Sequence, residues 1–225
     1  MKNTPTTTGI ALTQTGIIAV FLATTGAFSV MQHAQADGIA RCWGSNAYGE
    51  SSPPADLGTC MSVAAGTHHT IALRTDRGVR CWGSNYFGQC DTPADLGACS
   101  AIAGGNGHTI AVRADGTVRC WGHNYYGQCD TPSDLGNSSS VAAGMRHSMA
   151  LQIDGRSRSW GNSAYGQSYV PTDLGACSAI AAGGFHSIAI QSDGLVRCWG
   201  ANESGQLGNG STVDAVTPVT VRLPR

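Results

Sequence analysis

Residues 60–90 read CMSVAAGTHHTIALRTDRGVRCWGSNYFGQC, and the rest of the chain is built from variants of this stretch. Residues 69–74 alternate apolar and polar side chains, which predicts a half-buried strand. Small residues at 63–66 precede it, a turn signal at 76–78 follows, and residues 78–83 form a third apolar segment. Residues 88–90 are expected to begin a fourth strand. The stretch therefore predicts four short antiparallel strands.

This pattern recurs every 39 residues. Five residue types keep the spacing. They are Trp43, Trp82, Trp121, Trp160 and Trp199; His69, His108, His147 and His186; Gly66, Gly105, Gly144 and Gly183; Asp76, Asp115, Asp154 and Asp193; and Pro54, Pro93, Pro132 and Pro171. Because five types share one register, the chain is an array of supersecondary units.

Four short strands per unit are typical of a β-propeller blade. The small Ala-Ala-Gly segment is expected on the innermost strand, where blades crowd toward the axis. The tryptophan of the third strand is expected to fill the wider gap between blades further out. A helical solenoid is disfavoured, because glycines interrupt every segment and no stretch of about ten residues has a period of 3.6. We therefore predict an all-β propeller.

Composition excludes several classes of protein. The 225 residues include 13 Lys and Arg and 14 Asp and Glu, so the net charge is −1. Binding of nucleic acid through clustered basic charge is not expected. The 31 glycines argue against a coiled coil, and the apolar fraction of 41% argues against a disordered chain.

Residues 1–36 have the features of a secretory signal peptide. Lys2 is followed by an apolar run at 16–30 and by Ala34-Gln35-Ala36. The alternative is a membrane anchor, but the run of 15 residues is shorter than the ~18 that a spanning helix needs, and Thr24 and Thr25 weaken it further. We expect cleavage after Ala36, a secreted or periplasmic location and no membrane span afterwards. All nine cysteines lie in residues 37–225, the single repeat domain, as expected in an oxidising compartment.

The unit DGxVxCWGxNxxGQ, followed by PxDLG and IAAGxxHTxAL, resembles the regulator of chromosome condensation repeat. The resemblance covers residues 38 to about 220 and implies a propeller, which has seven blades in members of known fold. The compact spacer between Gly-Gln and Ala-Ala-Gly is more similar to secreted bacterial members, which include a propeller-type β-lactamase inhibitor. The eukaryotic founder is a nuclear nucleotide-exchange factor for a small GTPase, an activity not expected of an exported protein.

The number of repeats departs from seven. Five Trp-Gly segments occur but only four Ala-Gly…His segments, and residues 217–219 lie where the family begins another inner strand. We therefore expect four full blades plus a split fifth. The blades form either an open arc, with strand edges exposed for self-association, or a five-bladed ring closed by the N-terminal hairpin (38–50) and the C-terminal segment.

The repeated histidines and acids are expected to be structural. Equivalent histidines in adjacent blades stand about 10 Å or more apart, whereas zinc needs donors within ~2.1 Å, so no metal or other cofactor is predicted. The imidazoles are expected to bond neighbouring backbone, and Asp56, Asp76 and their equivalents to bond local N–H groups. No acid falls on the predicted inner strand, and no nucleophile elbow or phosphate loop occurs. The chain is therefore not expected to be an enzyme.

The cysteines allow two pairings. One joins Cys81 to Cys90 and Cys120 to Cys129; the other joins Cys60 to Cys81, Cys99 to Cys120 and Cys177 to Cys198. The second pairing connects first and third strands, which are ~9.6 Å apart and thus beyond the ~7 Å limit for Cα atoms. We favour the first. Because nine is odd, at least one thiol stays free or bridges two chains.

The repeats differ mainly in two loops that a meander places on one face. The candidate binding residues there are Tyr48, His68, Tyr86, Phe87, His123, Tyr125, Tyr126, Arg146, Tyr165 and Phe185. Rigid aromatic loops on a stiff scaffold are typical of protein-binding surfaces, although the tyrosines could instead only cover the blades.

We predict an exported, non-enzymatic propeller that binds an unknown protein partner through these loops. Inhibition of an extracytoplasmic enzyme is one version that the resemblance implies. The alternative is a lectin-like carbohydrate-binding module. Lectin sites should repeat identically in each blade, whereas these loops vary, and this favours a single protein partner.

Overall fold

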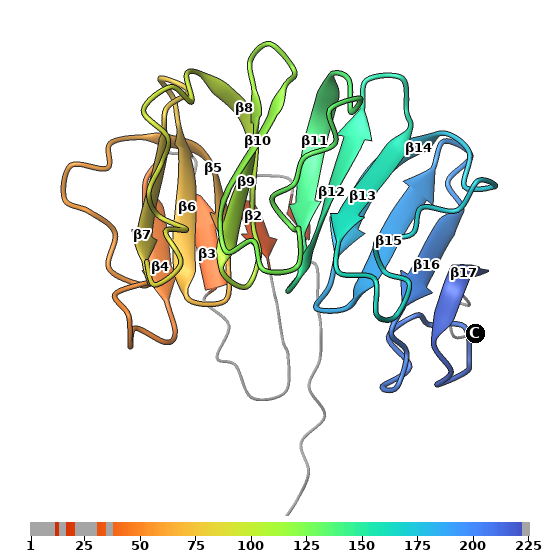
Figure 1. The fold of residues 1–225 in the computed structure, drawn as a ribbon. Coiled ribbons are helices and arrows are strands. Elements are labelled where there is room, and N and C mark those ends of the chain that lie inside the picture. Colours follow the sequence, from red (N-terminus) through yellow and green to blue (C-terminus); the bar gives the residue numbers. More distant parts are fainter. Residues whose placement is uncertain (1–11, 14–16, 21–30, 35–37, 222–225) are drawn as a thin grey trace, which may run out of the picture.

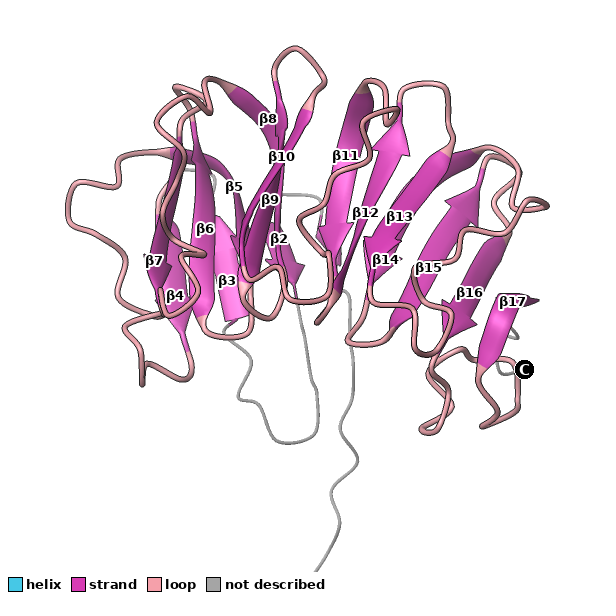
Figure 2. Ribbon diagram, viewed as in Figure 1, coloured by secondary structure: helices cyan, strands magenta, loops and turns pink. Residues whose placement is uncertain are grey.

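The computed structural model describes residues 12–13, 17–20, 31–34 and 38–221, with side chains from residue 38 onward. Every regular element in these residues is a β-strand (Figure 2), which confirms the all-β prediction. None of the described residues forms a helix with the length and hydropathy that crossing a membrane requires.

The strands form five antiparallel sheets, of which four are full repeats. Blade 1 is β5 (Cys60–Ala65), β6 (His69–Arg74) and β7 (Val79–Gly83). Blade 2 is β8 (Cys99–Gly104), β9 (His108–Arg113) and β10 (Val118–Gly122). Blade 3 is β11 (Ser138–Ala143), β12 (His147–Gln152) and β13 (Ser157–Gly161). Blade 4 is β14 (Cys177–Ala182), β15 (His186–Gln191), β16 (Val196–Gly200) and β17 (Ala215–Thr220).

The fifth sheet, here called the N-terminal sheet, is β1 (Leu12–Thr13), β2 (Ile17–Val20), β3 (Met31–Ala34) and β4 (Ala40–Trp43). The predicted signal peptide, residues 1–36, lies mostly outside the described residues. Three backbone segments within it are described, and β3 pairs with β4 antiparallel, with Ala34 opposite Ala40. Cleavage after Ala36, and the location that follows from it, stay predictions.

The four blades stand side by side in a curved, open row, from blade 1 on the left of Figure 1 to blade 4 on the right. The first strands β5, β8, β11 and β14 contact one another in turn along the row, which confirms that the Ala-Ala-Gly strand is innermost. Among the described strands, β17 does not pair with the N-terminal sheet, so the arrangement is the open arc rather than the closed ring.

Two local predictions are wrong. Residues 88–90 are not a fourth strand but part of successive tight turns, with the Asp91 N–H bonded to the Gly88 carbonyl at 3.1 Å. Blades 1–3 consequently have three strands each. Residues 217–219 belong to β17, which pairs with β16 at the outer edge of blade 4 and does not start a new inner strand.

Blades 1–3 each use both faces to pack on their neighbours, and blade 4 packs on blade 3. The side chains of Ile71 and Leu73 point from blade 1 toward blade 2, where they share a core cluster with Ala111 and Trp121. The same contact recurs between the following blades. The third-strand tryptophans therefore fill the gaps between blades, as predicted. Since blade 1 packs on the N-terminal sheet through Trp82 in the same way, the core is a row of interfaces.

Candidate functional site

Two loops of each blade lie on the same side of the row. The loop between the first and second strands bonds to the loop after the third strand, for example from the Ser84 N–H to the His68 carbonyl at 2.7 Å. Equivalent bonds tie His123 to Gly107 and Asn162 to Arg146, each at 2.8 Å. These loops carry all ten predicted residues, and we call the surface that they form the rim. It lies at the bottom of Figure 1, opposite the turns between second and third strands.

A buried glutamine shapes the loop after the third strand in blades 1–3. The side-chain oxygen of Gln89 accepts a hydrogen bond from the Phe87 N–H at 2.9 Å, and Gln89 is 2% exposed. The corresponding pairs are Gln128 with Tyr126 and Gln167 with Tyr165, also at 2.9 Å. From the sequence, residues 88–90 were expected to begin a fourth strand, so this role of Gln89 was missed, although its constant spacing from the aromatic residues was visible.

Glu50 takes the place of glutamine in the first rim loop. Its carboxylate accepts hydrogen bonds from the Tyr48 N–H at 2.8 Å and from the Ser45 hydroxyl at 2.8 Å. Burial raises the pKa of Glu50, but bonds from backbone N–H groups and from Ser45 outweigh this effect, so the pKa is lowered overall. The group therefore holds the Tyr48 loop as a carboxylate.

Aromatic rings connect the rim loops of blades 1 and 2. The Phe87 ring lies 4.8 Å from that of Tyr86 and 4.3 Å from that of His123. The His123 ring in turn lies 6.1 Å from Tyr126. Gly107 makes the contact between blades feasible, because a Cβ atom there would lie 2.8 Å from the Phe87 ring.

Arg146 connects this group to the rim of blade 3. The central carbon of its guanidinium lies 4.5 Å above the Tyr126 ring and 5.6 Å from the Phe185 ring, both within cation–π range. Phe185 then contacts Tyr165, with ring centroids 5.5 Å apart. Eight of the ten predicted residues thus form one connected cluster. They are Tyr86, Phe87, His123, Tyr125, Tyr126, Arg146, Phe185 and Tyr165.

The other two predicted residues form a separate pair, with the Tyr48 and His68 rings 4.9 Å apart. Within the cluster, two tyrosines project into solvent. Tyr86 is 86% exposed and Tyr125 is 83% exposed, whereas Tyr126, Tyr165 and Phe185 are only partly exposed. The projecting rings do not cover the blades, so the interpretation that the tyrosines serve only as lids does not apply to them.

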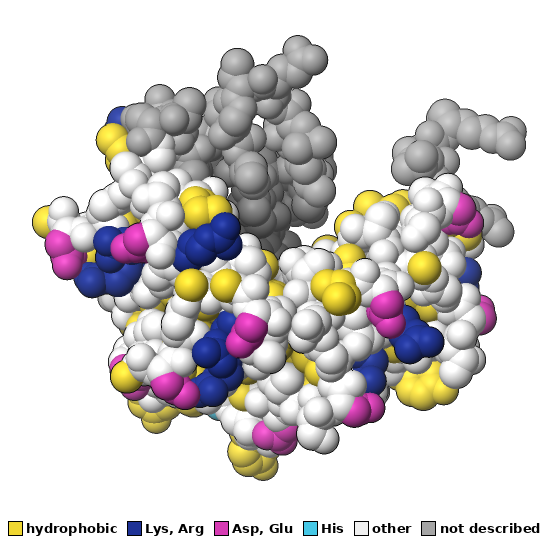
Figure 3. Space-filling model, turned by 90° about the horizontal axis from the view of Figure 1, so that it is seen from above, with side chains coloured by type: hydrophobic (Ala, Val, Ile, Leu, Met, Phe, Trp, Pro, Cys, Tyr) yellow, Lys and Arg dark blue, Asp and Glu magenta, His cyan; other side chains and the backbone are white. Residues whose placement is uncertain are grey.

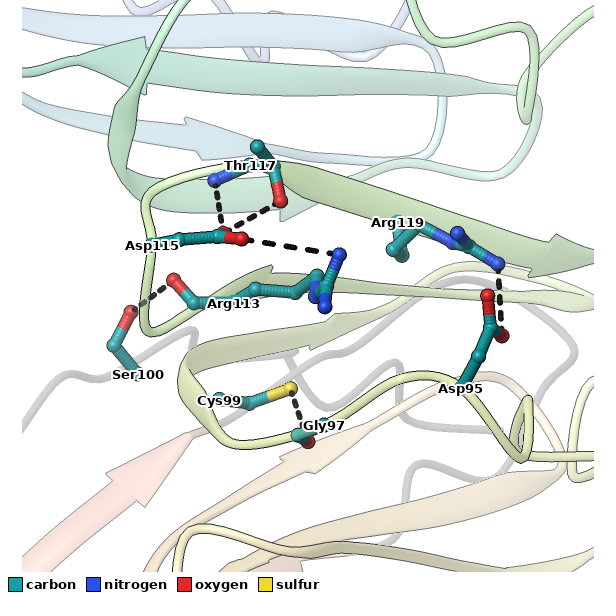
Figure 4. A network of polar contacts seen from close by, with 8 residues as sticks. All are labelled: Asp95, Gly97, Cys99, Ser100, Arg113, Asp115, Thr117 and Arg119. Atoms are coloured by element: carbon teal, nitrogen blue, oxygen red, sulfur yellow. Dashed lines mark hydrogen bonds and ion pairs between the residues drawn. The ribbon is translucent and has the colours of Figure 1, made fainter.

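The opposite side of the molecule has a different character. Figure 3 views it from above and shows basic and acidic side chains next to one another, with hydrophobic groups scattered between them. Asp115 bonds the Thr117 N–H at 3.0 Å, as predicted for the turn acids, and Figure 4 shows this contact beside the ion pair of Asp95 with Arg119. The connector acids were predicted wrongly, because Asp95 and its equivalents bond an arginine 24 residues later instead of local backbone. Mixed, paired charge of this kind offers no single-sign surface to a charged ligand.

Three of the four repeated histidines, His69, His108 and His147, are buried between blades, whereas His186 is only partly buried. His69 is fully buried and bonds the hydroxyl of Thr109 in the next blade, so the expected bond to backbone is wrong for the ring nitrogen. Burial lowers the pKa of His69 to about 4 and that of His108 to about 3, which keeps both rings neutral at pH 7. In the part of the chain that the structure describes, no three His, Cys, Asp or Glu side chains converge on a point that could hold a metal ion.

One disulfide is present, between Cys120 and Cys129, with Cα atoms 5.0 Å apart. It supports the pairing across the rim loop that we favoured. Cys81 and Cys90 occupy the same positions in blade 1 as free thiols. Cys60 does not pair with Cys81, because β6 lies between their strands, and its thiol faces the Gly58 carbonyl.

Comparison with known proteins agrees with this architecture. The model of the regulator of chromosome condensation (RCC1) repeat matches residues 62–89, 99–128, 139–167 and 177–206, and a second RCC1 repeat model matches residues 193–225. No curated protein matches the chain in sequence.

Several solved structures share the fold. Prp20p from Saccharomyces cerevisiae is 21% identical with a TM-score of 0.75, over 92% of this chain and 64% of that one. Human WBSCR16 is 20% identical with a TM-score of 0.74, over 92% and 68%. The ectodomain of the receptor kinase CR4 from Physcomitrella patens is 26% identical with a TM-score of 0.66, over 78% and 50%. The chain thus spans less than two thirds of the yeast and moss proteins. With repeat matches over most of the four blades, the chain belongs to the regulator of chromosome condensation repeat family.

Proposed function

We propose that this chain is an exported, non-enzymatic propeller that binds a partner protein through the rim. The observation that carries the proposal is the connected cluster of seven aromatic rings and Arg146, from which Tyr86 and Tyr125 project more than four fifths exposed. Aromatic residues and arginine dominate the energetics of protein interfaces, because they bury large areas at low entropic cost.

Two further observations support a protein partner. The buried glutamines hold the rim loops in place, so little order has to be gained on binding. Relatives by fold bind proteins too, since the yeast structure is described together with its binding to Gsp1p and histones. The rim loops differ from blade to blade, and a unique surface suits one partner better than the repeated sites of a lectin would. Inhibition of an extracytoplasmic enzyme is one version of this function, suggested by the resemblance to secreted bacterial members.

The test compares three forms of the full chain as baits against the native envelope fraction and on a glycan array. The rim variant carries Tyr86→Ala and Tyr125→Ala; the control carries Ile153→Ala, which is 72% exposed in a turn on the opposite side. We expect a protein that the wild type and the control retain and that the rim variant loses. Thermal unfolding should be unchanged in both variants, because the truncated side chains are exposed.

Three results would contradict the proposal. Retention of the same protein by the rim variant would mean that the rim does not bind it. Glycan binding that the rim variant loses would favour the lectin function. Unfolding of the rim variant would show that the rim is structural. Export is tested separately by N-terminal sequencing of the protein recovered outside the cytoplasm, which should begin at Asp37.

A further inference from the structure

Arg146 is exposed on the rim, and no carboxylate of the described residues forms an ion pair with it. Seven other arginines do form ion pairs with aspartates. Examples are Arg119 with Asp95 at 3.2 Å and Arg158 with Asp134 at 3.0 Å. Among the described side chains, the charge of Arg146 is therefore not offset by an acidic neighbour.

The contacts of Arg146 with aromatic rings leave its N–H groups unused. The central carbon of the guanidinium lies 4.5 Å above the Tyr126 ring and 5.6 Å from the Phe185 ring. Such contacts hold the side chain in place without a hydrogen bond, and its N–H groups donate to no other described residue. The donors of a guanidinium form a planar fork that matches the two oxygens of a carboxylate. Arg146 thus presents this fork, already positioned, on the rim.

His123 supplies a second donor in the same cluster. The side-chain oxygen of Gln128 accepts the Tyr126 N–H at 2.9 Å, so the side-chain nitrogen of Gln128 faces the Nδ1 atom of His123, also at 2.9 Å. That nitrogen can only donate, so Nδ1 accepts and the neutral ring carries its proton on Nε2. Burial, and then the charge of Arg146, lowers the pKa of His123, which keeps the ring neutral at pH 7. The Nε2–H group donates to no described residue.

Both donors depart from the repeat. The residues that correspond to His123 in the other rim loops are Ser45, Ser84, Asn162 and Ala201. Those that correspond to Arg146 are His68, Gly107 and Phe185. An imidazole and a guanidinium at these two positions occur together only once, on the neighbouring loops of blades 2 and 3. A site built from them is therefore single, unlike the positions that every blade repeats.

The carboxylates of the adjoining rim loops have other partners. Asp130 accepts a hydrogen bond from the Asn124 side chain at 2.7 Å, and Asp91 accepts one from the Asn85 side chain at 2.7 Å. Neither forms an ion pair with Arg146. Among the described residues, the centre of the rim thus combines aromatic faces with unused donors and lacks an acceptor of matching charge.

We propose that His123 and Arg146 form a carboxylate-binding subsite, which receives an aspartate or glutamate side chain from an acidic segment of the partner protein. The Arg146 fork binds the two carboxylate oxygens, and the His123 Nε2–H donates to one of them. The projecting ring of Tyr125 contacts the apolar part of the same segment. This inference rests on the binding function proposed above and adds the chemistry of the partner. Because a bond between a guanidinium and a carboxylate is charge-assisted, it is stronger than a neutral one.

The test is an NMR titration of the full chain with a blocked hexapeptide of alternating glutamate and glycine. A hexapeptide with glutamine in place of glutamate is the uncharged control. We expect the acidic peptide alone to shift the Nε–H signal of Arg146 until it saturates. The signal of Arg119 should stay in place, because that side chain is already paired on the opposite side. An unmoved Arg146 signal, or an equal response to both peptides, would overturn the proposal.

Two variants separate the donors. Arg146→Lys keeps the charge but loses the planar fork, and it should bind the acidic peptide about tenfold more weakly, followed at the Gly127 backbone amide. His123→Ser removes the Nε2–H donor but keeps an acceptor for Gln128, as Ser84 does for Gln89 in blade 1 at 3.4 Å. It should also weaken binding. Thermal unfolding checks both variants, and unchanged affinity in the folded variants would contradict the subsite.

Inorganic phosphate at matched ionic strength distinguishes a carboxylate subsite from a general anion site. We expect phosphate to shift the Arg146 signal much less than the peptide does, and an equal response would overturn the proposal. The result is separable from the binding function. If the Tyr86 and Tyr125 variant loses the envelope protein but the acidic peptide does not bind, the subsite fails alone. If the peptide binds at Arg146 but that variant retains the protein, the subsite is supported and the proposed function fails.

Discussion

The Nε2 atom of His69 lies 3.0 Å from the hydroxyl oxygen of Thr109 in the next blade. That hydroxyl donates to the Gln89 carbonyl at 2.8 Å, so it accepts the histidine N–H. The same carbonyl also accepts the indole N–H of Trp121 at 3.0 Å. One fully buried relay thus links each blade to its successor, and it recurs from His108 to Ser148 and from His147 to Ser187, again at 3.0 Å.

Replacing Thr109 by Val should therefore destabilise the fold. Valine has nearly the same shape but leaves the His69 N–H buried without an acceptor, which costs about 1–3 kcal/mol. Thr109→Ser is the matched control, because serine fills the same position in the following blades and keeps the hydroxyl. Urea unfolding should show a clearly larger loss for the valine variant, and equal losses would argue against the relay.

Stability should fall as the solution becomes acidic. Burial lowers the pKa of His69 to about 4, of His108 to about 3 and of His147 to about 4, from an ordinary value of 6.5. Between pH ~6.5 and the lowered pKa values, the unfolded chain binds more protons than the folded chain. The stability that the neutral histidines allow is therefore complete above pH ~6.5, and the free energy of unfolding decreases as the pH falls below it.

The measurement for this pH effect is the unfolding midpoint in urea between pH 7 and 4. A second curve for His108→Gln, which keeps an N–H donor and cannot titrate, should fall less steeply over the same interval. A wild-type midpoint that does not change with pH would contradict the burial of neutral histidines.

Gly144→Ala should cost more than about 2 kcal/mol. A Cβ atom at this position would lie 2.2 Å from the His147 ring and 2.5 Å from the Gly183 carbonyl, and neither neighbour can move without opening the interface. Gly184→Ala is the control, since its Cβ would meet only Met145 at 3.5 Å. Thermal unfolding of the two variants compares the sites directly, and a tolerated Gly144→Ala would mean that the histidine packs less closely than described.

Loss of the Cys120–Cys129 disulfide should destabilise the rim loop of blade 2. The bond closes a loop with a sequence separation of 9 that contains Tyr125 and Tyr126, which on loop-closure entropy stabilises by about 2–3 kcal/mol. Cys120→Ser with Cys129→Ser removes it, while Cys81→Ser with Cys90→Ser changes free thiols at the same positions of blade 1. Only the first pair of substitutions should abolish the effect of reductant on urea unfolding. If reductant has no effect on the wild type, the bond does not stabilise the fold.

Much of the fold was predictable because each structural position of the blade occurs several times in the sequence. The strand at 69–74 was predicted with its observed bounds, and the tryptophans fill the gaps as their size suggested. The fourth strand was mispredicted because Gln89 looks like a strand residue, whereas its side chain closes its own loop through the Phe87 N–H. One sequence carries no sign of which backbone group a side chain will bond.

The candidate site was predictable in location but not in contacts. A meander of short strands places the varying loops on one face, so the ten rim residues could be chosen from their positions alone. The stacking of Phe87 on His123 depends on the rotation between successive blades, which a repeat length does not specify. The partner of Asp95 could have been predicted from the sequence, because an arginine follows the connector aspartate by 24 residues in each blade, as Arg119 follows Asp95.

The histidine relay has a direction, because the histidine of each of blades 1–3 donates to a hydroxyl of the blade after it. A duplicated or deleted segment of 39 codons would rejoin the same donor to the same acceptor and create no new type of junction. Unequal recombination within such a gene could therefore lengthen or shorten the protein by whole blades while the interface between each remaining pair of blades is preserved.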